Sequence, residues 1–208
     1  MPSTDTLQQD VGYLRQLAEA GRDAPLSAGP YLVAGGGWFG LASLLMGLVD
    51  LSGQQSARDH LWLAFLLSAA GFSAHLAVLI RRERHRVQNH VNLAINAAWT
   101  AAGFGIFFFW MAATIVSVRH QSGFFMNAMP LLVLTVYAMA WWIAAVVSRQ
   151  RWMQGVVAIA VLSMVVVAAA IGTRYVWLAY ALALFGTALI PGIKLVRLAA
   201  TTRAAARE

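Results

Sequence analysis

Six stretches of this chain are apolar and free of charge almost to their ends. They cover residues 31–49, 61–80, 91–118, 124–148, 152–172 and 175–196. Crossing about 30 Å of hydrocarbon takes about 20 helical residues, so each stretch is long enough to be a transmembrane helix. The sequence therefore predicts an all-α membrane protein, built as a bundle of six transmembrane helices.

Composition supports this fold class and removes several kinds of chemistry. Hydrophobic residues make up 60% of the chain and charged residues only 11%, which is far from the usual balance of a soluble domain. The chain has no cysteine, so disulfides, thiolate metal sites and thiol nucleophiles are excluded.

Basic residues predict the orientation. Most of them fall in the N-terminal segment, the second and fourth loops, and the C-terminal tail: Arg15, Arg22, Arg81, Arg82, Arg84, Arg86, Arg149, Arg151, Lys194, Arg197, Arg203 and Arg207. The alternate loops hold only Arg58, Arg119 and Arg174. By the positive-inside rule, both termini are cytoplasmic. The net charge of +7 is therefore assigned to topology, and no nucleic-acid partner is expected.

Arginine greatly outnumbers lysine, and alanine is abundant. This usage favours a GC-rich bacterial genome, which places the six helices in a bacterial inner membrane as a multi-pass protein. The lipid bilayer is then the first partner of the chain.

The first 30 residues form a separate segment. A capping box at Thr6 and Gln9 and apolar residues on one helical face predict a short amphipathic cytoplasmic helix over residues 6–20. The segment has net negative charge, so docking onto a protein surface is favoured over lipid, with the basic loop 81–86 as one candidate. Residues 31–197 form the transmembrane domain, and residues 198–208 form a basic tail.

Carboxylate chemistry has no candidates inside the membrane. No Asp or Glu lies within a predicted helix core, because Asp50 and Asp59 fall at outer ends. His60 and His120 are also at outer ends, and their spacing matches no metal site. We expect neither a catalytic constellation nor a cofactor nor a metal, and so no enzyme.

A set of polar residues in the inner halves of the second, third and sixth helices is the candidate ligand site: His75, Asn92, Asn96, Tyr180, Thr187 and Lys194. One interpretation is structural, with side chains that hydrogen-bond between helices. The other is a cytoplasm-facing cavity for a small polar or aromatic ligand, in which His75 changes charge near neutral pH. A third interpretation, in which His75 is a haem or metal ligand, needs a second histidine at the same depth.

Small residues and prolines shape two helices. Gly36, Gly40 and Gly47 form a stripe on the first helix that favours close helix packing, either within the chain or in a homo-oligomer. Pro130 and Pro191 are expected to kink or interrupt the fourth and sixth helices.

Two function classes fit these features. A non-enzymatic membrane module, acting as a scaffold, sensor or complex subunit, fits the scarcity of embedded polar groups and a docking helix at the N-terminus. A small oligomeric permease or exporter fits six spans with kinked helices and a polar cavity. The sequence favours the module.

Overall fold

The computed structural model describes residues 12, 27–54, 60, 62–83 and 90–205. Its elements are the helices α2 (Gly29–Ser52), α4 (Trp62–Glu83), α5 (His90–His120), α6 (Phe124–Asn127), α7 (Met129–Ser148), α8 (Trp152–Ala170), α9 (Val176–Leu184), η1 (Phe185–Leu189) and α10 (Ile190–Ala205). The predicted amphipathic helix over residues 6–20 lies outside the described residues, as does most of the basic loop after α4.

Among the residues that the structure describes, six spans are long and apolar enough to cross a membrane, which indicates a membrane protein. Their bounds follow the charge-free stretches closely, because water-exposed loops begin where charged and turn residues appear. α2 starts earlier than expected, at Gly29 with Pro30 in its first turn, where the missing N–H of proline costs nothing. The last span continues into the basic tail as far as Ala205.

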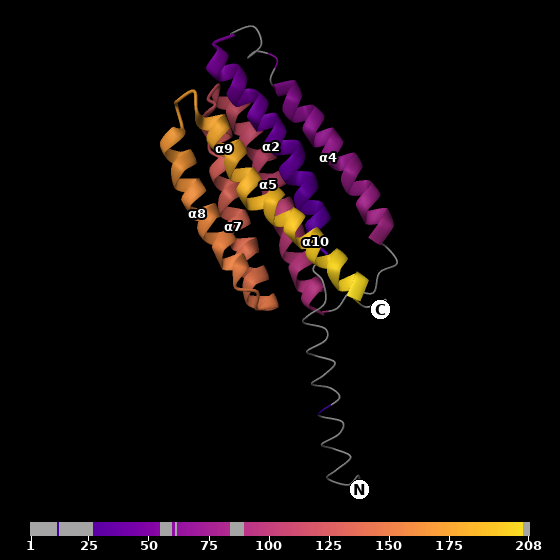
Figure 1. Cartoon of the computed structure of the whole chain (residues 1–208). Helices are drawn as coiled ribbons and strands as arrows, with labels where there is room; N and C mark the ends of the chain where they lie inside the picture. The colour runs from indigo at the N-terminus through magenta and orange to yellow at the C-terminus, as the bar shows by residue number, and fades with distance from the viewer. Residues whose placement is uncertain (1–11, 13–26, 55–59, 61, 84–89, 206–208) are drawn as a thin grey trace.

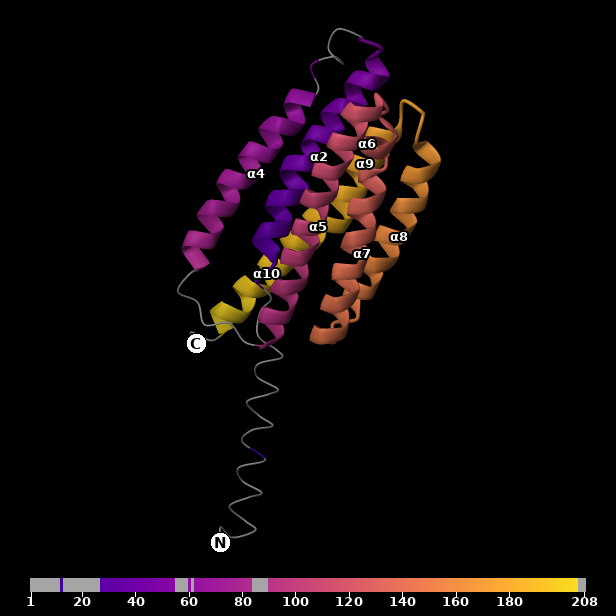
Figure 2. The same ribbon diagram turned by 180° about the vertical axis from the view of Figure 1, so that it is seen from behind.

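The helices form one antiparallel bundle, in which the start of α2 and the end of α10 lie at the same end (Figure 1). We call this the terminal end, and the opposite end the distal end. α2 is the central helix, since it packs against α4, α9, η1 and α10. α7 packs against α8 and α5 on the other side of the bundle, as the reverse view also shows (Figure 2).

The glycine stripe of α2 faces the last span of the same chain. A Cβ on Gly36 would lie 2.6 Å from the backbone nitrogen of Leu189, and one on Gly47 would lie 2.6 Å from Cγ of Leu178. These distances leave no room for a side chain. The stripe that could have served as a homo-oligomer face is thus filled within the chain, because it matches the backbone of the last helix.

Both prolines coincide with breaks in their helices, as predicted. α6 ends at Asn127 and α7 begins at Met129, directly before Pro130. In the last span, the Ile190 N–H bonds to the carbonyl of Phe185, five residues back. This is the hydrogen bond of a π-helix, and it directly precedes Pro191.

Candidate functional site

An amide cluster closes the terminal end of the bundle. The Ser27 N–H donates to Oδ1 of Asn92 over 3.0 Å, and the Asn96 side-chain amide donates to Oγ of Ser27 over 3.1 Å. Asn92 and Asn96 are one helical turn apart on α5, so both face the same point. Together they hold the residue that leads into α2, and they tie α2 to α5 where those helices otherwise have few contacts.

A stack of aromatic rings lies next to these amides. The Trp99 ring meets Tyr137 edge-on at a centroid distance of 5.3 Å and Trp141 at 5.5 Å. Trp141 in turn contacts Trp152 at 5.8 Å. Edge-to-face pairs of this kind add about 0.5–1.5 kcal/mol each beyond the area they bury. The stack joins α5, α7 and α8 through one buried ring, Trp141.

Trp141 also satisfies the backbone of the last span. Its indole Nε1–H donates to the carbonyl of Thr187 over 2.8 Å, in a fully buried position. In a regular helix that carbonyl would accept from residue 191, but Pro191 has no N–H to give. The Thr187 hydroxyl donates to the carbonyl of Ala183 at 2.7 Å. An interrupted helix can therefore sit in the core without leaving this carbonyl unsatisfied.

Lys194 ends the stack toward the terminal end. Its Nζ lies 4.1 Å from the centroid of the Trp152 ring, which is a cation–π contact. The Lys194 side chain is exposed, so its charge stays accessible from outside the bundle while the indole packs against it. Trp152 thus contacts both the aromatic stack and a lysine of the last span.

Four of the six predicted site residues belong to this region: Asn92, Asn96, Thr187 and Lys194. Tyr180 is buried with Val133 and Leu134, among the residues that hold α9 against α7. His75 is exposed on α4, whose main neighbour is α2, and the structure does not bring it to Asn96. α4 and α5 follow each other in the sequence, but they do not pack together in the structure, because α4 packs against α2.

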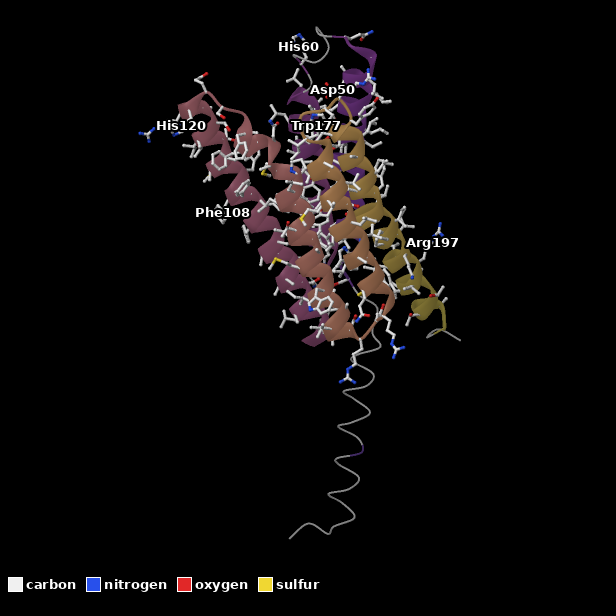
Figure 3. All side chains as sticks on the ribbon, turned by 90° about the vertical axis from the view of Figure 1, so that its left-hand side faces the viewer. Asp50, His60, Phe108, His120, Trp177 and Arg197 are labelled. Atoms are coloured by element: carbon white, nitrogen blue, oxygen red, sulfur yellow. The ribbon has the colours of Figure 1, made fainter. Side chains whose placement is uncertain are left out.

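The cluster is made of hydrogen-bonding and aromatic side chains. It offers amides, indoles, a phenol and one lysine, and no described nucleophile lies next to a base. No group of three His, Cys, Asp or Glu side chains suited to a metal ion occurs within the described ranges. His60 and His120 lie well apart at the distal end (Figure 3).

Sequence reasoning missed Ser27, Tyr137 and Trp141. Pro191 carried a usable signal, since a proline within a buried helix requires a donor for the carbonyl four residues earlier. That rule points to Thr187 but does not say which helix supplies the donor. No family model, no curated protein and no solved structure matches this chain.

Proposed function

We propose that this protein is a non-enzymatic membrane module that assembles with copies of itself. One observation carries the proposal: α4 and α5 are attached to the bundle by one side only. In their apolar spans, 6% and 11% of residues are buried, against 44% in α2 and in the last span. Two of the six helices thus keep most of their surface for neighbours outside the chain.

The uncovered side of α4 has small residues in its middle, Ala70, Ser73, Ala74 and Ala77, with large exposed residues such as Leu67 and Val78 on either side of them. Small residues allow helices in a membrane to approach closely, as the glycine stripe of α2 does within the chain. His75 is exposed beside them, and an imidazole facing lipid is unfavourable. A protein neighbour would relieve that cost.

The uncovered side of α5 is bulky. It exposes Phe104, Phe107, Phe108 and Trp110, and the rings of Phe104 and Phe108 stack at 6.0 Å. Large rings on one helix and small residues on another are complementary shapes. We therefore expect the α5 face of one copy to pack against the α4 face of the next copy.

Crosslinking tests this directly, because the native chain has no cysteine. Ala70 lies 13 residues before Glu83, and Phe104 lies 14 after His90, so both are at similar depth, about 20 Å from the same loop. Chains carrying Ala70→Cys and chains carrying Phe104→Cys are co-expressed and oxidised in membranes. We expect a covalent heterodimer between the two variants.

Leu162→Cys, on the exposed side of α8, is the matched control for random collisions in the membrane. We expect a low yield of covalent dimer between Leu162→Cys chains and Ala70→Cys chains. Equal yields of covalent dimer for the Phe104→Cys and Leu162→Cys pairings, together with the mass of a monomer in nanodiscs, would refute the proposal. Crosslinking of Ala70→Cys to a different protein would keep the module but refute self-assembly.

A second candidate is a small oligomeric permease for a polar or aromatic molecule. It is favoured by the break in the last span, because interrupted helices in transporters expose backbone groups to substrates. Proteoliposome uptake of small amines and aromatic acids discriminates the two. Saturable uptake that Trp141→Phe alters would support the permease.

The proposal also includes the location of the protein, which is a bacterial inner membrane with both termini in the cytoplasm. Its support is the excess of basic residues at the terminal end, with Arg81, Arg149, Arg151 and Arg197 there and only Arg119 and Arg174 described at the distal end. A C-terminal green fluorescent protein fusion should fluoresce, and an alkaline phosphatase fusion should be inactive. The opposite pattern would invert the topology.

A further inference from the structure

A cavity opens at the distal end of the bundle, far from the amide and aromatic cluster. It has a volume of about 290 Å³ and is lined by four elements: the end of α2, the α6–α7 break, the α8–α9 turn and the start of α9. That volume is just below the range of about 300–1,000 Å³ that is usual for small-molecule sites, so only a small ligand fits. The walls come from segments distant in sequence, so the cavity is a product of the fold.

Its walls carry both signs of charge. Asp50, near the end of α2, and Arg174, in the α8–α9 turn, both line it, together with the amide of Asn127. A carboxylate attracts an ammonium group, and a guanidinium pairs with a carboxylate or phosphate through parallel N–H bonds. A ligand that carries both kinds of group matches this lining better than a simple cation or anion.

An aromatic ring strengthens the acidic side of the cavity. Trp177 lines the cavity with Asp50, and the two residues lie together at the distal end (Figure 3). The indole is held against Phe65 at a centroid distance of 5.4 Å. An ammonium group over an indole gains a cation–π contact, and tryptophan is the best ring for it.

The basic side is held in place by the turn. The Thr173 hydroxyl donates to the carbonyl of Ala170 over 2.7 Å and accepts from the Tyr175 N–H over 3.2 Å. Gly172 has φ +82°, a conformation that glycine adopts without strain. The Arg174 guanidinium donates to the Tyr175 hydroxyl over 3.1 Å, which uses one of its five N–H donors. The turn thus sets the backbone at Arg174, and the Tyr175 hydroxyl accepts one of its N–H groups.

We propose that this distal cavity binds a small zwitterion, with the ammonium group at Asp50 and Trp177 and the acidic group at Arg174. The ligand is either a free solute or the phosphoethanolamine headgroup of a lipid, since the two share this chemistry. The inference does not rest on self-assembly, because no residue of α4 or α5 lines the cavity, and α4 contributes only Phe65, which packs against the Trp177 ring.

Binding of O-phosphoethanolamine to the full chain in phosphatidylglycerol nanodiscs, measured by calorimetry, tests the free source. Ethanolamine and inorganic phosphate each supply only one of the two charges and should bind at least about tenfold more weakly. The lipid source is tested by native mass spectrometry from nanodiscs of equal phosphatidylethanolamine and phosphatidylglycerol. Selective retention of phosphatidylethanolamine is expected there if the ligand is a lipid.

Variants decide whether the cavity is responsible. Asp50→Asn and Arg174→Gln should each weaken binding or lipid retention at least about tenfold, the loss of one charge-assisted contact. Arg119→Gln removes an exposed arginine at the same end and should change nothing. Arg174 is exposed in a turn, so its variant remains informative even if Asp50→Asn does not fold. Ethanolamine or phosphate binding as tightly as phosphoethanolamine, or binding that ignores both variants, would refute the proposal.

Discussion

The central helix α2 meets two neighbours through glycine, and the two contacts differ in kind. Toward the last span, a Cβ added to Gly36 would lie 2.6 Å from the backbone nitrogen of Leu189. Toward α4, the ring of Trp38 covers Gly71, with a Cβ there 2.7 Å from the indole edge, and the Ser68 hydroxyl donates to the Trp38 carbonyl over 3.0 Å. We call these the inner seam and the outer seam.

The difference shows which contacts can adapt. Backbone in the middle of a buried helix cannot move aside, so the inner seam tolerates no added atom. Trp38 is 40% exposed, and its ring can change rotamer when Gly71 gains a side chain. Damage to the inner seam should therefore unfold the bundle, whereas damage to the outer seam should loosen only α4.

Gly36→Leu should have the largest effect. The new side chain would collide with backbone on the last span, at a cost of about 3 kcal/mol or more in the free energy of unfolding. The free energy is measured by reversible SDS titration of the purified protein. Gly37→Leu is the matched control, because a Cβ at Gly37 meets nothing within 4 Å. Similar losses for both variants would show that the inner seam is not where we place it.

Trp141→Phe should come second. It keeps a ring but removes the donor to the Thr187 carbonyl, at a cost of about 1–3 kcal/mol in the free energy of unfolding. Pro191→Ala restores an N–H for that carbonyl, so the double variant should lose less than the two single variants together. Trp142→Phe, on the exposed side of α7, should stay within about 0.5 kcal/mol. If the losses in unfolding free energy of Trp141→Phe and Pro191→Ala simply add in the double variant, the Trp141 indole does not compensate for the missing N–H of Pro191.

Gly71→Ala at the outer seam should cost about 1 kcal/mol or less, since only the Trp38 side chain has to move. The same SDS titration measures it, next to Gly36→Ala at the inner seam. We expect the inner variant to lose more stability. The reverse order would mean that α4 is the better anchored of the two neighbours.

Asn96→Ala should have the smallest measurable effect. It removes a hydrogen bond to Ser27, and such bonds between membrane helices average about 0.6 kcal/mol. His75→Ala, on the exposed side of α4, should leave the stability of the monomer in detergent unchanged. Loss of stability in His75→Ala alone would indicate that α4 faces α5 after all.

The six spans could be predicted from sequence because hydrocarbon thickness sets helix length and charge marks the ends. The breaks near Pro130 and Pro191 followed from the chemistry of proline. The glycine stripe was correctly read as a packing surface. Each of these inferences needs only one segment of the chain at a time.

Pairing between helices could not be predicted in the same way. Apolar residues surround all six helices, so no sequence pattern says that α4 packs on α2 and leaves His75 uncovered. Asn92 and Asn96 bond to Ser27, which lies in the segment before α2 and has no periodic signal. The distal cavity joins Asp50 to Arg174, residues whose separate positions in loops and helix ends gave no hint of one lining.

Distances between spin labels in nanodiscs test the difference between the two seams most directly. Leu41→Cys and Leu182→Cys place labels on exposed sites of α2 and α9, across the inner seam, and Leu48→Cys and Leu67→Cys place them on α2 and α4, across the outer seam. When Gly71→Leu is added, we predict an unchanged narrow distribution across the inner seam and a shifted or broadened one across the outer seam. If both distributions change together, or if only the inner one changes, the two seams are not independent and the account is wrong.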